Sequence, residues 1–446
     1  MTALEAREAG TDRESDAGQR QWQDLVCWLG IVAVGLAITV WAVASGARLG
    51  TDAAPFLGVY RIQLSPWAVA APLVAIAVLW TSATARAARW RWRTVLGLSW
   101  LASFGWMTAL ALMQGPTGLT AYLSDRDGYR PDIAGLDSLG ELVRALADTD
   151  SPHSGSVTGH PPGTVAALWA LHSLPLPTWA IGLIWTALSA AAIPLILTVA
   201  RSACGPAAAR RFAPLIVLAP FAIWAAVGPD GLTTTIAAAA LTAADRASRA
   251  ARRGWPATGW AVSAGLLLAL ATMFAYLVAW LGLSMMLLYF ARRRPGHNLV
   301  SGLAALVPLG VAQLCGFDWA QGLTAAYDGY LSRIETERSM GWWLVLCAVV
   351  LTVACGPALV AGARKVRNTP AWPFLVGAAA AVVFSAVVGV ARGGVEETWL
   401  PLFPWLMIAA TAPAVPGGRP QPAPLLLAGG GAVAGIALQA VLVSPW

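Results

Sequence analysis

Three of the four histidines of this chain stand in one polar segment between Ser151 and Leu174, SPHSGSVTGHPPGTVAALWALHSL. The segment follows the longest polar stretch of the sequence and leads into unbroken apolar sequence. His160 precedes a Pro-Pro-Gly turn at the edge of that apolar sequence, where water can reach its imidazole. A histidine in this position can hydrogen-bond a phosphate group or order its own loop. We therefore expect the chemistry of the chain in this loop and beside it.

Other residues that can bind anions or accept protons stand beside the apolar runs rather than within them. A guanidinium can hold a phosphate through two parallel hydrogen bonds, and Arg338 and Arg392 lie where a lipid phosphate would be. The positions of Arg338 and Arg392 are equally consistent with side chains that only extend to the lipid head groups. Glu396 and Glu397 are adjacent, so on a helix they point about 100° apart and only one faces a site. Asp230 follows a Gly-Pro pair and either caps the next helix or contacts a substrate.

The composition excludes a soluble protein. Hydrophobic residues make up 58% and charged residues 11% of the 446 positions, against about 25% charged residues in soluble proteins. Apolar runs of about 17 to 25 residues recur from Leu25 onward, long enough to cross a bilayer as helices. We expect an all-α, polytopic transmembrane helical bundle. The net charge of +7 follows from basic residues retained on the cytoplasmic side and does not indicate nucleic-acid binding.

The five cysteines show neither metal-ligand spacing nor a disulfide framework. Their scattered positions in apolar sequence favour small buried side chains. The carboxylates are too dispersed to indicate a metal site. We expect no metal and no cofactor.

Five basic clusters orient the bundle, because lysine and arginine are retained on the cytoplasmic side. The clusters are 86–93, 201–211, 246–253, 292–294 and 364–367. Placing all five inside predicts about 13 spans, with the N-terminus inside and the C-terminus outside. The expected spans are 25–46, 65–85, 94–114, 178–200, 212–227, 231–249, 257–272, 273–291, 299–315, 341–362, 371–390, 399–412 and 425–443. Residues 257–291 are divided into two spans because they are too many for one.

The remaining segments are assigned by this topology. Residues 1–23 are expected to be a disordered cytoplasmic tail, and residues 24–446 a single transmembrane domain. The first large outer loop is 115–177, and it ends in a helix near 163–174 that is too short to cross. The second outer loop is 316–340. We expect short interfacial helices in these loops.

Two motifs resemble those of a known family. The first outer loop opens with the acids Asp125 and Asp127 and closes with Gly159-His-Pro-Pro-Gly163, and residues 394–404 read GVEETWLPLFP. Together they resemble the GT-C class of polyprenyl-phosphate-sugar-dependent membrane glycosyltransferases, whose actinobacterial members carry a late GEVER-WLPF-P segment. Thr398 stands where those members have arginine. The size and motifs are most similar to the methylthioxylose or pentose transferase branch.

The resemblance implies transfer of a sugar from a polyprenyl-phosphate donor to an envelope glycan or glycolipid, on the outer, periplasmic face of a bacterial plasma membrane. The acceptor hydroxyl must lose its proton as it attacks the anomeric carbon, and one carboxylate can accept that proton. Asp125, soon after the third expected span, matches the position of the acid in this class. Asp127 is the alternate, although Asp127-Gly128 is also typical of a turn.

The same resemblance implies further contacts to donor and acceptor. The leaving lipid phosphate needs cations or oriented donors. Tyr327 and Tyr330 lie one helical turn apart and form either one face of a sugar platform or part of an interfacial aromatic belt. The expected substrate-binding residues are His160, Arg338, Arg392, Glu396, Glu397, Asp230, Tyr327 and Tyr330. The expected partners are the lipid-linked donor, the glycan or glycolipid acceptor and the bilayer, with no nucleic acid.

Two other classes of function stay open at this point. A lipid-linked sugar flippase or other transporter usually needs ionisable residues near the midplane, and the expected spans almost lack them. A non-catalytic subunit of an envelope-biosynthesis complex would use the outer loops as contact surfaces. In an enzyme the outer acids, His160 and the two arginines should converge, whereas in a subunit they would spread over the surface.

Overall fold

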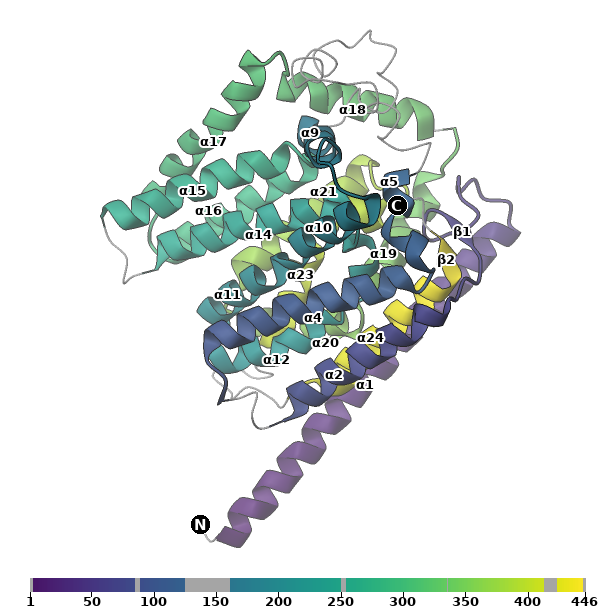
Figure 1. Ribbon diagram of the computed structural model, residues 1–446. Coiled ribbons are helices and arrows are strands. Elements are labelled where there is room, and N and C mark those ends of the chain that lie inside the picture. Colours follow the sequence, from purple (N-terminus) through teal and green to yellow (C-terminus); the bar gives the residue numbers. More distant parts are fainter. Residues whose placement is uncertain are drawn as a thin grey trace.

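The computed structural model describes residues 3–84, 89–124, 161–249, 254–334, 336–412 and 423–443. This part of the chain is a helical bundle whose long helices run side by side (Figure 1). Strands β1 (Val59–Tyr60) and β2 (Leu442–Val443) pair antiparallel, with Val59 opposite Val443 and Tyr60 opposite Leu442. The strand pair ties the loop after the first helix to the end of the last helix. The expected all-α fold class is confirmed.

The helices follow one another along the whole chain. Those of the first half are α1 (Ala3–Ala44), η1 (Pro66–Val69), α2 (Ala70–Ala83), α4 (Trp92–Leu112), η2 (Pro116–Leu119), α5 (Ala121–Ser124), α9 (Pro162–His172), α10 (Thr178–Ala190), α11 (Ala192–Cys204), α12 (Pro206–Val217) and α13 (Ala222–Ala225). Those of the second half are α14 (Pro229–Ser248), α15 (Trp255–Thr272), η3 (Tyr276–Trp280), α16 (Leu281–Ala291), α17 (Gly296–Leu314), α18 (Trp319–Ile334), α19 (Met340–Cys355), α20 (Pro357–Ala363), η4 (Val366–Asn368), α21 (Trp372–Val388), α22 (Val395–Thr398), α23 (Phe403–Met407), η5 (Ile408–Thr411) and α24 (Leu425–Val441).

Among the described residues, six helical segments are long and apolar enough to cross a membrane. They are Ala17–Ala44, Pro66–Ala83, Trp92–Leu112, Thr178–Cys204, Trp255–Thr272 and Gly296–Leu314. A seventh candidate joins α19 and α20, which are bent by 101° at Gly356, whose φ of 64° favours glycine. Three shorter apolar helices are Tyr276–Ala291, Trp372–Val388 and Leu425–Val441. The protein is multi-pass, and 13 spans are not confirmed.

Several local expectations can be compared with the helices. Residues 257–291 form two helical segments, because α15 ends at Thr272 and η3 begins at Tyr276. Helix α9 has 11 residues, which at about 1.5 Å per residue is too short to cross. Helix α1 begins at Ala3, so residues 3–23, for which a disordered tail is expected, continue the helix of the first span.

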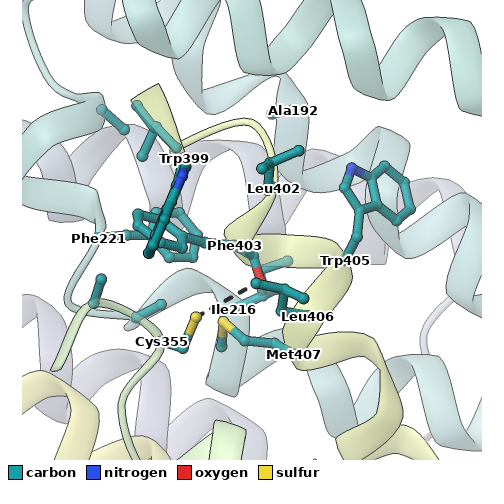
Figure 2. Close-up of a cluster of buried hydrophobic side chains, with 14 of the residues drawn as sticks. Ala192, Ile216, Phe221, Cys355, Trp399, Leu402, Phe403, Trp405, Leu406 and Met407 are labelled. Atoms are coloured by element: carbon teal, nitrogen blue, oxygen red, sulfur yellow. Dashed lines mark hydrogen bonds between the residues drawn. The ribbon is translucent and has the colours of Figure 1, made fainter. Parts of the chain in front are cut away.

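The expected spans 212–227 and 399–412 are wrong as single spanning helices. The first is divided into α12 and α13, and the second is reduced to α23 and η5. Figure 2 shows Phe403, Trp405 and Met407 in a cluster of buried apolar side chains, and all three are fully buried. Two prolines in LPLFP limit helix length, and the apolar side chains of this segment face protein instead of lipid.

The basic clusters gather at one end of the bundle, which we call the basic end. Arg201 and Arg210 lie over the Trp92 ring, with their guanidinium carbons 4.8 and 5.8 Å from its centroid. Arg292 donates to the Asp245 carboxylate at 2.8 Å and to Ser202 at 3.4 Å.

Three more segments of the basic end lie close together: α1, α12 and the 364–367 cluster. Arg364 pairs with Asp24 of α1. Arg211, next to Arg210 in α12, lines one cavity with Asp24 and with Lys365, the neighbour of Arg364. Described residues of all five clusters therefore share one end, as a bundle with all clusters on the cytoplasmic side requires.

This arrangement predicts the result of cysteine labelling in intact cells. With Cys27 and Cys315 replaced by Ser, a single Cys introduced at Glu337 should react with an impermeant maleimide. A single Cys at Arg89 or Arg367 should react only after the cells are permeabilised, because the basic end faces the cytoplasm. Labelling of Arg89→Cys without permeabilisation would reverse the orientation proposed below.

Candidate functional site

Three glycines shape the loop that carries the two adjacent glutamates. Helix α21 ends at Gly389 with φ 82°, and Gly393 and Gly394 follow with φ 100° and 71°. Such backbone conformations favour glycine, because they strain residues that have a Cβ. The short helix α22 then begins at Val395. The loop lies at the end of the bundle opposite the basic end, because α21 starts only a few residues after the 364–367 cluster.

Glu396 is fully buried. Its Oε1 accepts a hydrogen bond from the Leu57 backbone N–H at 2.9 Å, and its Oε2 has no hydrogen-bond partner among the described residues. Burial raises the pKa of this carboxyl to about 7, although the Leu57 amide, its own backbone amide and Arg338 oppose the rise. The carboxyl therefore keeps its proton to a higher pH than an exposed glutamate does.

Glu397 and Asp230 complete the acidic group, and both are partly exposed residues, in contrast to Glu396. Burial raises the pKa of Glu397 well above its usual value, and the negative charges of Asp230 and Glu396 raise it further. Three carboxylates from α22 and the start of α14 thus lie within electrostatic reach of one another. Like charges held this close favour retention of a proton.

Asp230 lies in the first turn of α14, which begins one residue earlier at Pro229. Its carboxylate hydrogen-bonds its own backbone N–H, and the helix dipole favours a negative charge there. The approach to this turn is strained, because Val227 has φ 64°, an outlier for a β-branched residue. The Val227 N–H donates to Thr186 Oγ1 at 3.2 Å, which helps to hold the strained turn.

Arg338 and Arg392 hold each other through their backbones. Arg338 Nη1 donates to the Arg392 carbonyl at 2.8 Å, and Arg392 Nη1 donates to the Arg338 carbonyl at 3.4 Å. The Nε atoms of both are buried, with no hydrogen-bond partner among the described residues. A Cβ added at Gly50 or Gly393 would lie within 3 Å of the Arg338 side chain. The glycines therefore open the slot in which this guanidinium lies near Glu396.

The two tyrosines of α18 differ in their surroundings. Tyr330 Oη accepts a hydrogen bond from the Arg392 N–H at 3.0 Å, and burial raises its pKa. The Tyr327 side chain is 36% exposed. The structure brings Tyr330 to the arginines, and the shared sugar platform expected for both tyrosines stays a prediction.

Asp125, Asp127 and His160 lie outside the described residues, but the chain on either side of them is described. Leu123 of α5 and Val165 of α9 pack in one apolar cluster with Val227. Gly163 N–H donates to the Met273 carbonyl at 2.6 Å, and a Cβ at Gly163 would lie 2.6 Å from that same oxygen. The described residues on either side, Leu123 and Val165, thus lie in the same cluster as Val227, in the turn that leads to Asp230.

The contribution of the loop 45–65 is absent from the sequence prediction. Its Leu57 amide binds Glu396, its Gly50 receives Arg338, and Arg48 Nη1 donates to the Thr336 carbonyl at 3.0 Å. A backbone amide carries no side-chain signature. The sequence signal that could have indicated this loop is its glycines. Gly50 and Gly58 both have positive φ, which glycine adopts readily.

The site combines carboxylates with guanidinium groups, so it can bind sugar hydroxyls and stabilise negative charge on an oxyanion. The described residues contain no group of three or more His, Cys, Asp or Glu side chains arranged to hold a metal ion. The carboxylates and guanidinium groups of the described part of the site support acid–base and ionic chemistry.

No family model matches the chain, and no curated protein sequence matches it. Two crystal structures of ArnT from Cupriavidus metallidurans are similar, one in the apo state and one bound to undecaprenyl phosphate, each with a TM-score of 0.41 and 18% sequence identity. The aligned regions cover 60% and 57% of this chain. They cover 52% and 49% of the ArnT chain, so this chain matches about half of that protein's length.

The buried Glu396 carboxyl predicts a pH dependence of stability. Below about pH 4.5 the carboxyl is protonated in both states, and up to about pH 7 the folded state keeps the proton that the unfolded state loses. Stability should therefore fall as the pH rises through this window and then level off, by about 3 kcal/mol for a shift of this size. Glu396→Gln keeps an acceptor for Leu57 and cannot ionise, so its thermal midpoint should fall less between pH 5 and 8.

Glu337→Gln is the matched control, because Glu337 is exposed. Its midpoint should run parallel to that of the wild type across the same pH range. If the Glu396→Gln midpoint also runs parallel to the wild type, Glu396 does not hold a proton in the folded protein.

Proposed function

We propose that this protein is an integral membrane glycosyltransferase. It transfers a sugar from a polyprenyl-phosphate donor to an envelope glycan or glycolipid at the outer face of the plasma membrane. The observation that supports this proposal best is the convergence of Asp230, Glu396 and Glu397 with Arg338 and Arg392. An enzyme needs such convergence, whereas the contact surfaces of a subunit do not.

The position of the site supports an enzyme of the outer membrane surface. The carboxylates lie at the end of the bundle opposite the basic clusters, and the positive-inside rule assigns the basic end to the cytoplasm. Helix α14 runs from one end of the bundle to the other, with Asp230 in its first turn and Asp245 near its last turn. At 1.5 Å per residue, these two residues lie about 22 Å apart along the helix. Its intervening residues carry no charge, which disfavours an ion-coupled transporter.

The reaction is a single displacement at the anomeric carbon. The acceptor oxygen bonds to that carbon as its proton passes to a carboxylate, and the bond from the carbon to the phosphate oxygen of the donor breaks. We propose Asp125 as the base, with Asp127 as the alternate. The position of Leu123 supports this choice, because Leu123 packs with Val227 near Asp230 and precedes Asp125 in the sequence by two residues.

The described residues take supporting roles in this proposal. Glu397 and Asp230, which are partly exposed residues, accept hydrogen bonds from sugar hydroxyls. Arg338 and Arg392, with His160, stabilise the charge of the leaving lipid phosphate. Glu396 is buried and holds the loop 45–65 through Leu57, so it is a positioning residue.

The first test is the base. In cells that lack the native gene, Asp125→Asn should lower formation of the envelope glycan product about 100- to 10,000-fold per molecule of protein, because asparagine cannot take the proton. Binding of polyprenyl phosphate to the purified variant should be largely kept. Product is measured by comparing envelope glycans of cells that express the wild type, the variant or neither.

Asp127→Asn is the matched control and should be much milder. An Asp125→Asn protein that keeps more than about a tenth of the wild-type rate excludes Asp125 as the base. The same substitutions at Asp127, Asp230 and Glu397 then locate the base. If none of them lowers the product, the protein is not the transferase, and the subunit interpretation is favoured.

His160 gives a second prediction. If His160 contacts the donor phosphate, His160→Ala should weaken use of the lipid-linked donor while the purified protein keeps its thermal midpoint. The measurement is product formed against donor concentration, with His172→Ala as the control in the neighbouring helix. Loss of folded protein in His160→Ala would instead assign His160 to the structure of the Pro-Pro-Gly turn.

A further inference from the structure

A cavity lined by charged residues lies at the basic end, at the opposite end of the bundle from Asp230, Glu396 and Glu397. Five segments meet around it: α1, α12, the end of α20 with the turn after it, η5 and the start of α24. Its volume is about 40 Å³, and on this measure a single water needs about 10–15 Å³. It therefore has room for more than one water.

Positive charge dominates the wall of this cavity. Arg20, Arg211 and Lys365 line it, and Asp24 is the acidic residue among the described lining residues. Asp24 is itself buried and paired with Arg364. The negative charge of Asp24 is therefore shared with a fourth cation, and the described lining residues together keep a net positive charge.

The hydrogen bonds of these cations are incomplete within the described part of the chain. Arg211 Nη1 is buried there with no hydrogen-bond partner. Lys365 Nζ donates one hydrogen bond, to the Ala410 carbonyl at 3.2 Å, and an ammonium group has three donors. Burial lowers the pKa of Lys365; Asp24 opposes this, and Arg364 and Arg20 add to it. Arg211 and Lys365 are partly buried, and cations held close together without enough counter-charge disfavour one another.

We propose that this cavity binds a phosphate group, with Arg211 and Lys365 as its main donors and Arg20 at its rim. A phosphate oxygen accepts several hydrogen bonds at once and supplies the missing negative charge. The group comes either from an anionic phospholipid of the cytoplasmic leaflet or from a soluble phosphate. Basic pockets between transmembrane helices on the cytoplasmic side bind lipid head groups in this way.

The surroundings of the cavity favour the lipid. Trp22 of α1, next to the lining residue Gln21, is 57% exposed, and Leu426 of α24, near the lining residue Pro424, is 38% exposed. Exposed apolar and aromatic side chains beside a polar cavity are typical of the membrane interface. The acyl chains of a lipid held by its phosphate would lie along these two helices.

The test is ligand-dependent stabilisation of the purified full-length protein in dodecyl maltoside. Phosphatidylglycerol, dioleoylglycerol, which has no phosphate, and inorganic phosphate are titrated separately at constant ionic strength. A ligand that binds only the folded state raises the thermal midpoint in proportion to ln(1 + [L]/Kd). We expect phosphatidylglycerol to raise it and dioleoylglycerol not to. A matching effect of inorganic phosphate would identify a soluble phosphate as the source.

Two variants and one control decide whether the cavity is responsible. Arg211→Gln and Lys365→Gln should each weaken apparent phosphate affinity about tenfold or more, since each removes charge-assisted hydrogen bonds. Arg367→Gln removes the same charge from an exposed residue of the same end and should keep the wild-type affinity. If Arg211→Gln fails to fold, Lys365→Gln decides, because Lys365 lies in a turn. Equal affinity in all variants, or no binding by the wild type, would overturn the proposal.

Discussion

A carboxylate that water cannot reach must find hydrogen-bond donors and positive charge within the protein. Glu396 is such a buried carboxylate, at the end of the bundle opposite the basic end. The Leu57 amide donates to it, and Arg338 is near enough to favour its ionised form. Segments far apart in the sequence are joined as a result. Without Arg338, the ionised carboxyl would keep only the hydrogen bonds of the Leu57 amide and of its own backbone amide, so its burial would be more costly.

The apolar core below α22 explains how the glutamates are held and why the span prediction for 399–412 was wrong. Trp399 Nε1 donates to Ser385 Oγ at 2.9 Å, and Phe403 packs against Phe221 with ring centroids 6.1 Å apart (Figure 2). Hydropathy measures how unfavourable contact with water is for a side chain. Burial in a membrane and burial in a protein interior both remove that contact. The sequence therefore predicted that this segment is apolar, but not that it contacts protein instead of lipid.

The residue types of the site were more predictable than their partners. Arg392, Glu396 and Tyr330 could be selected from the sequence because charged residues make up only 11% of it and tyrosine occurs only 7 times. The backbone hydrogen bond from Arg392 to Tyr330 and the Leu57 amide could not be predicted, since they depend on tertiary packing between segments distant in sequence. The basic clusters were placed correctly at one end, because charge patterning is a property of the sequence itself.

Helices α1 and α24 connect the two ends of the bundle. Asp24 of α1 belongs to the basic cavity, and the start of α24 lines the same cavity. At the opposite end, β2 directly follows α24 and pairs with β1, two residues after Leu57. Helix α1 packs closely on α19, since a Cβ at Gly35 would lie 2.6 Å from Val349. A phosphate held in the basic cavity would therefore stabilise the helices that also fix the Leu57 loop, even though it lies far from the carboxylates.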